Sequence, residues 1–125
     1  MIALDASALL ALLYGERGHD RVAAAAEDAC ISAVNLSEVL GRFARDGHDP
    51  LVVLEQIEST ALEIVPFGTE QAALAAALVP ATAPHGLSLG DRACLSLAAA
   101  RRIATLTADR TWARLDVGVD VRLIR

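Results

Sequence analysis

Four acidic residues stand at positions from which their carboxylates could act together: Asp5, Glu38, Asp91 and Asp109. Like charges brought close together repel, so such a cluster is costly unless a cation neutralises it. Oxygen ligands with few nitrogen or sulfur partners suit Mg²⁺ or Mn²⁺. Such cations can activate water and stabilise the oxygens of an in-line phosphoryl displacement. The chemistry that these residue types predict is therefore metal-assisted phosphoryl chemistry.

Three of these acids also have a simple structural interpretation, which the sequence leaves open. Asp5 and Asp109 each stand at the start of a predicted helical segment, where a carboxylate commonly caps the first turn. Glu38 lies on a helical stripe with Asn35 and Arg42, so it could form a solvated i,i+4 pair with Arg42. Capping and metal binding can coexist in one carboxylate.

Asp91 is harder to explain as a surface residue. Its helical neighbours at i+3, i+4 and i+7 are Cys94, Leu95 and Ala98, so this stripe should turn Asp91 inward. The segment beginning at Ser88 also resembles a capping box, in which Ser88 and Asp91 would bond each other's backbone N–H groups. The helix N-terminus would help to keep the Asp91 carboxylate ionised.

The elements that must position these residues alternate between short apolar strands and helices. The pattern predicts strands at 2–4, 30–31, 64–65, 104–106 and 121–124. It predicts helices at 6–13, 20–26, 33–45 with Ser32 as cap, 50–59, up to 78 with Thr69 as cap, up to 102 with Ser88 as cap, and a turn at 111–114. The segment 80–86 is predicted to be a loop. This alternation is typical of an α/β domain with a parallel sheet and helices on both faces, in which sites form at the carboxyl ends of strands.

Composition narrows the possible classes of protein. A chain of 125 residues is expected to form a single domain over 1–125. The net charge of −5 argues against a module that coats nucleic acid by charge alone, and every basic residue is arginine. Cys30 and Cys94 are too isolated for a disulfide framework or a zinc site, so we expect two buried thiols. We find no signal peptide and no apolar run that would span a bilayer, so a cytoplasmic location is expected.

Four segments together resemble a known family. They are 2–10 (IALDASALL), 32–39 (SAVNLSEV), 87–95 (LSLGDRACL) and 106–110 (LTADR), and each contains one of the four acids. In this order they resemble the acidic motifs of PIN domains, in particular those of VapC-type toxins from bacterial toxin–antitoxin pairs. The resemblance spans essentially the whole chain.

The resemblance implies a PIN-like three-layer α/β/α sandwich with a mostly parallel sheet, and a Mg²⁺- or Mn²⁺-dependent endoribonuclease. It carries the catalytic and metal-binding roles to Asp5, Glu38, Asp91 and Asp109. The first three would be the principal ligands, whereas Asp109 would act through water or on a second ion. The nucleophile would be water activated by the metal. Polar residues that match supporting positions are Ser7, Asn35 and Thr107.

The resemblance also implies partners: an RNA substrate, a cognate antitoxin protein that holds the enzyme inactive, and a second copy in a homodimer. The apolar helices at 6–13 and 51–57 are candidates for the antitoxin surface, although they could equally belong to the core. RNA phosphates would be bound by arginines around the groove, for which the candidates are Arg42, Arg92 and Arg110.

Rival functions on a similar fold are less consistent with the sequence. Phosphoacceptor receiver domains use a lysine on a late strand, and this chain has none. Haloacid-dehalogenase-like phosphatases use Asp-x-Asp after the first strand. Here Asp5 matches the first aspartate of that motif, but Ser7 replaces the second. A catalytically silent PIN-fold binding module would be expected to lack one of the acids, and none is missing. RNA is favoured over DNA by the resemblance alone.

Overall fold

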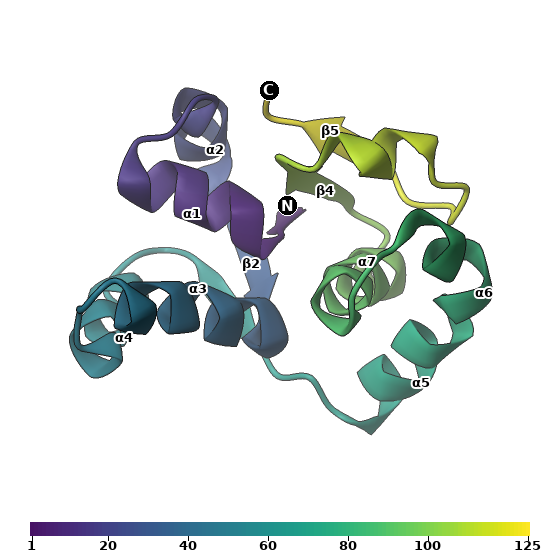
Figure 1. Ribbon diagram of the computed structural model, residues 1–125, viewed down its shortest axis with the longest axis horizontal. Coiled ribbons are helices and arrows are strands. Elements are labelled where there is room, and N and C mark those ends of the chain that lie inside the picture. Colours follow the sequence, from purple (N-terminus) through teal and green to yellow (C-terminus); the bar gives the residue numbers. More distant parts are fainter.

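The computed structural model describes all 125 residues and has a five-stranded sheet at its centre (Figure 1). Its strands are β1 (Ile2–Leu4), β2 (Ala29–Ser32), β3 (Glu63–Val65), β4 (Ala104–Thr107) and β5 (Val121–Leu123). The strand order is β3-β2-β1-β4-β5, and every neighbouring pair is parallel. The predicted α/β fold with a parallel sheet is thus confirmed.

Seven α-helices flank the sheet. They are α1 (Ala6–Tyr14), α2 (His19–Ala25), α3 (Ala33–Arg45), α4 (Pro50–Glu58), α5 (Thr69–Ala77), α6 (Val79–Thr82) and α7 (Leu89–Arg101). Short 3-10 turns occupy Ala26–Asp28, Ala83–His85 and Arg110–Arg114. No helix combines the length and the apolar character needed to cross a membrane.

The core is divided between the two faces of the sheet, because successive strand residues point to opposite sides. Ile2 and Leu4 pack with residues of α1 and α2 on one face, whereas Ala3 packs with residues of α7 on the other. Cys30 and Cys94 are free, buried thiols in the second cluster, as expected for small apolar side chains. This arrangement makes the three layers of the predicted sandwich.

Two local predictions were wrong. The segment 80–86 is largely helical, because Pro80 and Pro84 stand in the first turns of α6 and of the turn Ala83–His85, where a missing N–H costs no hydrogen bond. Thr69 does not cap α5 but is its first residue, and Gly68 occupies the cap without a side-chain hydrogen bond.

Candidate active site

The topology places all four acids at the carboxyl ends of the strands. Asp5 directly follows β1, and Asp109 lies two residues beyond β4. Glu38 lies in the second turn of α3, which begins where β2 ends. Asp91 lies in the first turn of α7, whose opposite end leads into the start of β4. Because the strands are parallel, these positions share one edge of the sheet.

Asp5 is the buried member of the group, with only 4% of its surface exposed. Its Oδ1 accepts hydrogen bonds from Ser7 Oγ at 2.7 Å and Ala8 N at 2.8 Å, and its Oδ2 accepts one from Thr107 Oγ1 at 2.6 Å. Burial nevertheless raises the pKa of Asp5 from 3.8 to about 6, since the hydrogen bonds offset the lost hydration only in part and the nearby Asp91 charge raises it further. Asp5 therefore carries a carboxylate whose charge the protein does not fully compensate.

Two hydroxyl groups hold Asp5 against β4. Ser7 Oγ accepts a hydrogen bond from Ala108 N at 2.9 Å while it donates to Asp5. Thr107 Oγ1 accepts one from Asp109 N at 3.0 Å while it donates to Asp5. Both hydroxyls thus tie the end of β1 to the end of β4, and they fix the orientation of the Asp5 carboxylate.

Asn35 joins the second acid to the third. Its Nδ2 donates to Glu38 Oε1 at 2.9 Å and to the carbonyl of Gly90 at 2.9 Å, while its buried Oδ1 has no partner. A Cβ at Gly90 would overlap the Glu38 carboxylate, so a glycine is needed for α3 and α7 to approach this closely. Glu38 consequently lies against the residue that precedes Asp91. This role of Gly90 could not be predicted from its neighbours in sequence, because it depends on the contact with Glu38 of another helix.

Asp91 and Asp109 both act as caps. The capping box of α7 is present, with Ser88 N donating to Asp91 Oδ2 at 2.9 Å and Asp91 N donating to Ser88 Oγ at 3.2 Å. Asp91 is half-buried. Asp109 is exposed, and its Oδ1 accepts a hydrogen bond from Thr111 N at 2.9 Å. The capping interpretation is confirmed for both, as it is for Asp5.

The three predicted arginines are placed differently from one another. Arg42 does not pair with Glu38, because its Nε lies 3.0 Å from Asp46 Oδ2 and its guanidinium covers the Tyr14 ring. Arg92 donates to the carbonyl of Leu87 at 2.9 Å, beside the start of α7. Arg110 donates to the carbonyl of Arg125 at 3.0 Å. Only Arg92 and Arg110 therefore remain without an acidic partner.

The acidic side chains of the site are of the type that binds a hard divalent cation. No three His, Cys, Asp or Glu side chains are arranged around a common point as metal ligands. Asp5, Glu38 and Asp91 offer only carboxylate oxygens, the preference of Mg²⁺ and Mn²⁺. The raised pKa of Asp5 marks a charge that a cation would stabilise. Gly90 leaves room for Glu38 to approach α7. By these three observations the residues fit such an ion.

The comparisons with known proteins define the class of this protein. The family model for the PIN domain matches residues 2–118, so the chain belongs to the PIN-domain family, whose members are typically nucleases. A search of curated proteins gives no match.

Solved structures with the same fold include several toxin–antitoxin assemblies. A toxin–antitoxin complex from Klebsiella pneumoniae matches with a TM-score of 0.78 and 19% identity, covering 100% of this chain and 98% of the other. DNA-bound VapBC from Salmonella typhimurium matches with a TM-score of 0.73 and 19% identity, covering 100% of both chains. FitAcB from Neisseria gonorrhoeae matches with a TM-score of 0.71 and 22% identity, covering 97% of this chain and 96% of the other. At these identities the likeness establishes the fold.

Proposed function

We propose that this PIN domain is a metal-dependent endoribonuclease and the toxin of a type II toxin–antitoxin pair, in the manner of VapC. The observation that carries the proposal is the buried Asp5 carboxylate, whose pKa is raised to about 6 at an edge shared with Glu38, Asp91 and Asp109. Strongly perturbed carboxyl groups beside other acids are typical of functional sites.

In this proposal Asp5, Glu38 and Asp91 hold Mg²⁺ or Mn²⁺, and Asp109 acts from the rim. When bound, such a cation neutralises charge on a phosphodiester and acidifies water for attack on phosphorus. Thr107 and Ser7 orient Asp5 through hydrogen bonds of 2.6 and 2.7 Å.

Asn35 is the corresponding positioning residue for Glu38, which it holds by a hydrogen bond of 2.9 Å. The capping box fixes Asp91 on α7. Hydrogen bonds from residues that do not touch the metal themselves orient its ligands and tune their basicity. We therefore assign Ser7, Thr107 and Asn35 to positioning the ligands rather than to the reaction itself.

The test is RNA cleavage with matched variants. Purified protein is incubated with structured RNA in Mg²⁺ or Mn²⁺, with EDTA as the metal-free control. Asp91→Asn removes a proposed ligand, whereas Asp116→Asn removes an exposed acid outside the site. We expect metal-dependent cleavage by the wild type and by Asp116→Asn, and none by Asp91→Asn. Absence of both cleavage and metal binding in the wild type would favour the catalytically silent binding module.

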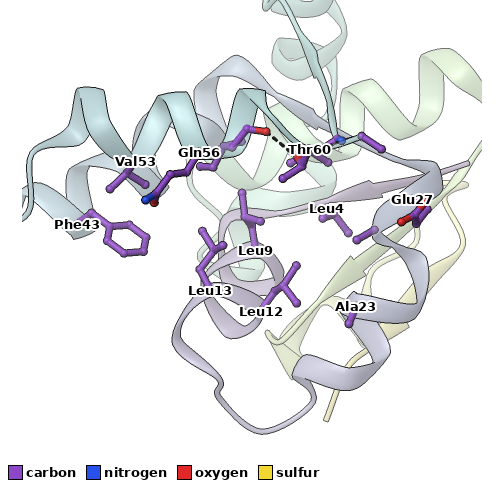
Figure 2. A pocket seen from close by; sticks show the side chains of 14 residues that line it. Leu4, Leu9, Leu12, Leu13, Ala23, Glu27, Phe43, Val53, Gln56 and Thr60 are labelled. Atoms are coloured by element: carbon purple, nitrogen blue, oxygen red, sulfur yellow. Dashed lines mark hydrogen bonds between the residues drawn. The ribbon is translucent and has the colours of Figure 1, made fainter.

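A cognate antitoxin is the proposed partner, because the similar structures are a toxin–antitoxin complex from Klebsiella, VapBC from Salmonella and FitAcB from Neisseria. An apolar groove of about 510 Å³ lies between α1, α2 and α4. In Figure 2, Leu9, Leu12 and Leu13 of α1 face Val53 of α4 across it. Ala23 and Glu27 lie at its other side. An apolar helix face of an antitoxin would fit such a groove.

The groove can be tested separately from catalysis. Leu13 is 41% exposed, so Leu13→Glu should leave the fold intact while it places a charge in the groove. We expect this variant to cleave RNA as the wild type does and to escape inhibition by the antitoxin. Retained inhibition would exclude the groove as the docking surface. We also propose a homodimer, and sedimentation analysis of the isolated protein would detect it.

A further inference from the structure

Four arginines lie on the segments that surround the end of β5, on the side of the sheet where the acids lie. Arg17 and Arg21 come from the connection of α1 to α2 and from α2, Arg110 from the turn after β4, and Arg125 from the segment after β5. All four are exposed. In Figure 1 the chain end after β5 lies beside α2. We call this set the arginine patch.

Hydrogen bonds from arginine side chains to main-chain oxygens hold the patch together. Arg21 Nη1 donates to the carbonyl of Leu123 at 3.1 Å, Arg110 Nη1 to that of Arg125 at 3.0 Å, and Arg125 Nη1 to that of Arg17 at 2.8 Å. Gly18 has a φ of +91°, and a Cβ there would overlap the carbonyl of Ile124. The loop before α2 is therefore seated directly on the segment that follows β5.

The patch adjoins the acidic site through two short connections. Ile124 N donates to the carbonyl of Thr107 at 3.0 Å, and Thr107 Oγ1 in turn holds Asp5 at 2.6 Å. Asp109 directly precedes Arg110, whose side chain reaches Arg125. A chain of a few bonded residues thus links the patch to the buried carboxylate.

No side-chain carboxylate of the protein forms an ion pair with an arginine of the patch. The ion pairs of the molecule involve Arg42, Arg101, Arg122 and the N-terminal ammonium, and none involves a patch arginine. Each patch hydrogen bond to a carbonyl uses one of five donors, so most remain free for an anion. Glu16, Asp20 and Asp109 neighbour the patch in sequence without forming ion pairs to it.

We infer that the arginine patch binds the phosphate backbone of single-stranded RNA and leads it to the acidic edge. This inference rests on the proposed nuclease function and deepens it. A site made of carboxylates would repel the phosphates of the substrate, and the inference assigns the binding of those phosphates to the arginine patch. Arginine binds phosphate oxygens well because its planar donors match their geometry. Contacts of this kind position a strand without reading its sequence.

The test measures binding without turnover. A labelled single-stranded RNA is titrated in EDTA at several salt concentrations, with the wild type and with Arg17→Gln/Arg110→Gln. The matched control is Arg101→Gln/Arg122→Gln, which removes the same charge near the starts of the strands. A third variant, Arg17→Lys/Arg110→Lys, keeps the charge and alters the hydrogen-bonding geometry. Melting temperatures of all variants are recorded alongside.

We expect the patch variant to bind RNA about 10-fold more weakly than the control. The slope of log K against log salt should fall by about 1.4, the value for two lost phosphate contacts on a single strand. The lysine variant should keep most of the wild-type slope. A purely structural patch would lower the melting temperature and leave the salt slope unchanged, and that result would overturn the inference.

Two further outcomes separate this inference from the proposed function. If the wild type never cleaves RNA but the patch variant still loses binding and slope, the nuclease proposal fails and the patch assignment stands. If cleavage occurs and the patch variant binds like the control, the patch assignment fails alone. A polyglutamate peptide serves as a competing probe: loss of its binding with unchanged RNA binding would assign the patch to an acidic protein segment instead.

Discussion

Three acidic side chains near the starts of strands are paired with cations, whereas the four acids at the carboxyl ends are not. Before β2, Asp28 lies 3.0 Å from the N-terminal ammonium. At β3, Glu63 lies 2.7 Å from Arg101, and before β5, Asp120 lies 2.9 Å from Arg122. At the other edge, Asp5 accepts hydrogen bonds only from hydroxyl and backbone groups.

The pKa values follow this difference. The hydrogen bond from Arg101 holds the pKa of Glu63 below its ordinary value, while burial raises that of Asp5 to about 6. The protein thus pairs Asp28, Glu63 and Asp120 with cations at one edge and leaves the buried Asp5 without a cationic partner at the other. Residue type alone does not distinguish these acids; the presence of a cationic partner does. The carboxyl edge is therefore the place where a cation from solution would be stabilised most.

The largest effect is expected from Asp5→Asn, compared with Asp120→Asn at the opposite edge. Asparagine preserves the shape of Asp5 and can still cap α1, but it removes the charge that we assign to the cation. Metal-dependent RNA cleavage should fall at least about 100-fold, because even outer-layer partners of a metal site contribute 10–100-fold. Asp120→Asn should cleave at the wild-type rate. Equal losses in the two variants would erase the distinction between the edges.

The same substitution should change how stability depends on pH. The folded pKa of Asp5 is raised, so between pH 3.8 and about 6 the folded state binds more protons than the unfolded state, and stability falls as the pH rises through that window. The penalty at neutral pH amounts to about 3 kcal/mol. Denaturant unfolding at pH 4 and pH 7 should show Asp5→Asn gaining stability relative to the wild type at the higher pH. A pH-independent difference would contradict the raised pKa.

Two glycines provide a smaller test on the helices that carry the acids. Gly90→Ala should displace the Glu38 carboxylate and reduce cleavage about 10-fold, the lower end of the range for metal-site supports. Gly41→Ala, where nothing lies within 4 Å of the new Cβ, should leave cleavage unchanged and stabilise α3 by about 0.5–1 kcal/mol. Cleavage rates and melting curves distinguish the two. Wild-type cleavage by Gly90→Ala would remove Glu38 from the site.

The smallest effect is expected from Glu63→Gln, which breaks the exposed ion pair with Arg101. Exposed pairs contribute little to stability because water already solvates both charges. Cleavage should remain at the wild-type level, with only a slight decrease in melting temperature. A large loss of activity here would show that the paired edge also takes part in the reaction.

Local features of the site could be predicted from the sequence, whereas contacts between distant segments could not. Ser32 and Ser88 were identified as caps because a cap depends on residues within one turn. The choice of Arg42 between Glu38 and Asp46 depends on Tyr14, which comes from another helix. The contact of Glu38 with Gly90 likewise joins two helices that are far apart in sequence.

The fold shows the same division. Alternating strands and helices predicted the parallel sheet because each element has its own hydrophobic pattern. The helical segment at Val79–Thr82 was missed, because prolines usually indicate a loop and are tolerated here only by their place in the first turn. The arginine patch could not be foreseen, since it depends on how Gly18 meets Ile124.

The central claim, that the carboxyl edge binds a divalent cation through Asp5, is tested most directly by calorimetric titration with Mn²⁺. The wild type, Asp5→Asn and Asp120→Asn are titrated in the same buffer near neutral pH, with RNA absent. We predict that the wild type and Asp120→Asn bind Mn²⁺ with the same affinity and that Asp5→Asn binds at least about 10-fold more weakly. No binding by the wild type, or equal binding by Asp5→Asn, would contradict the claim.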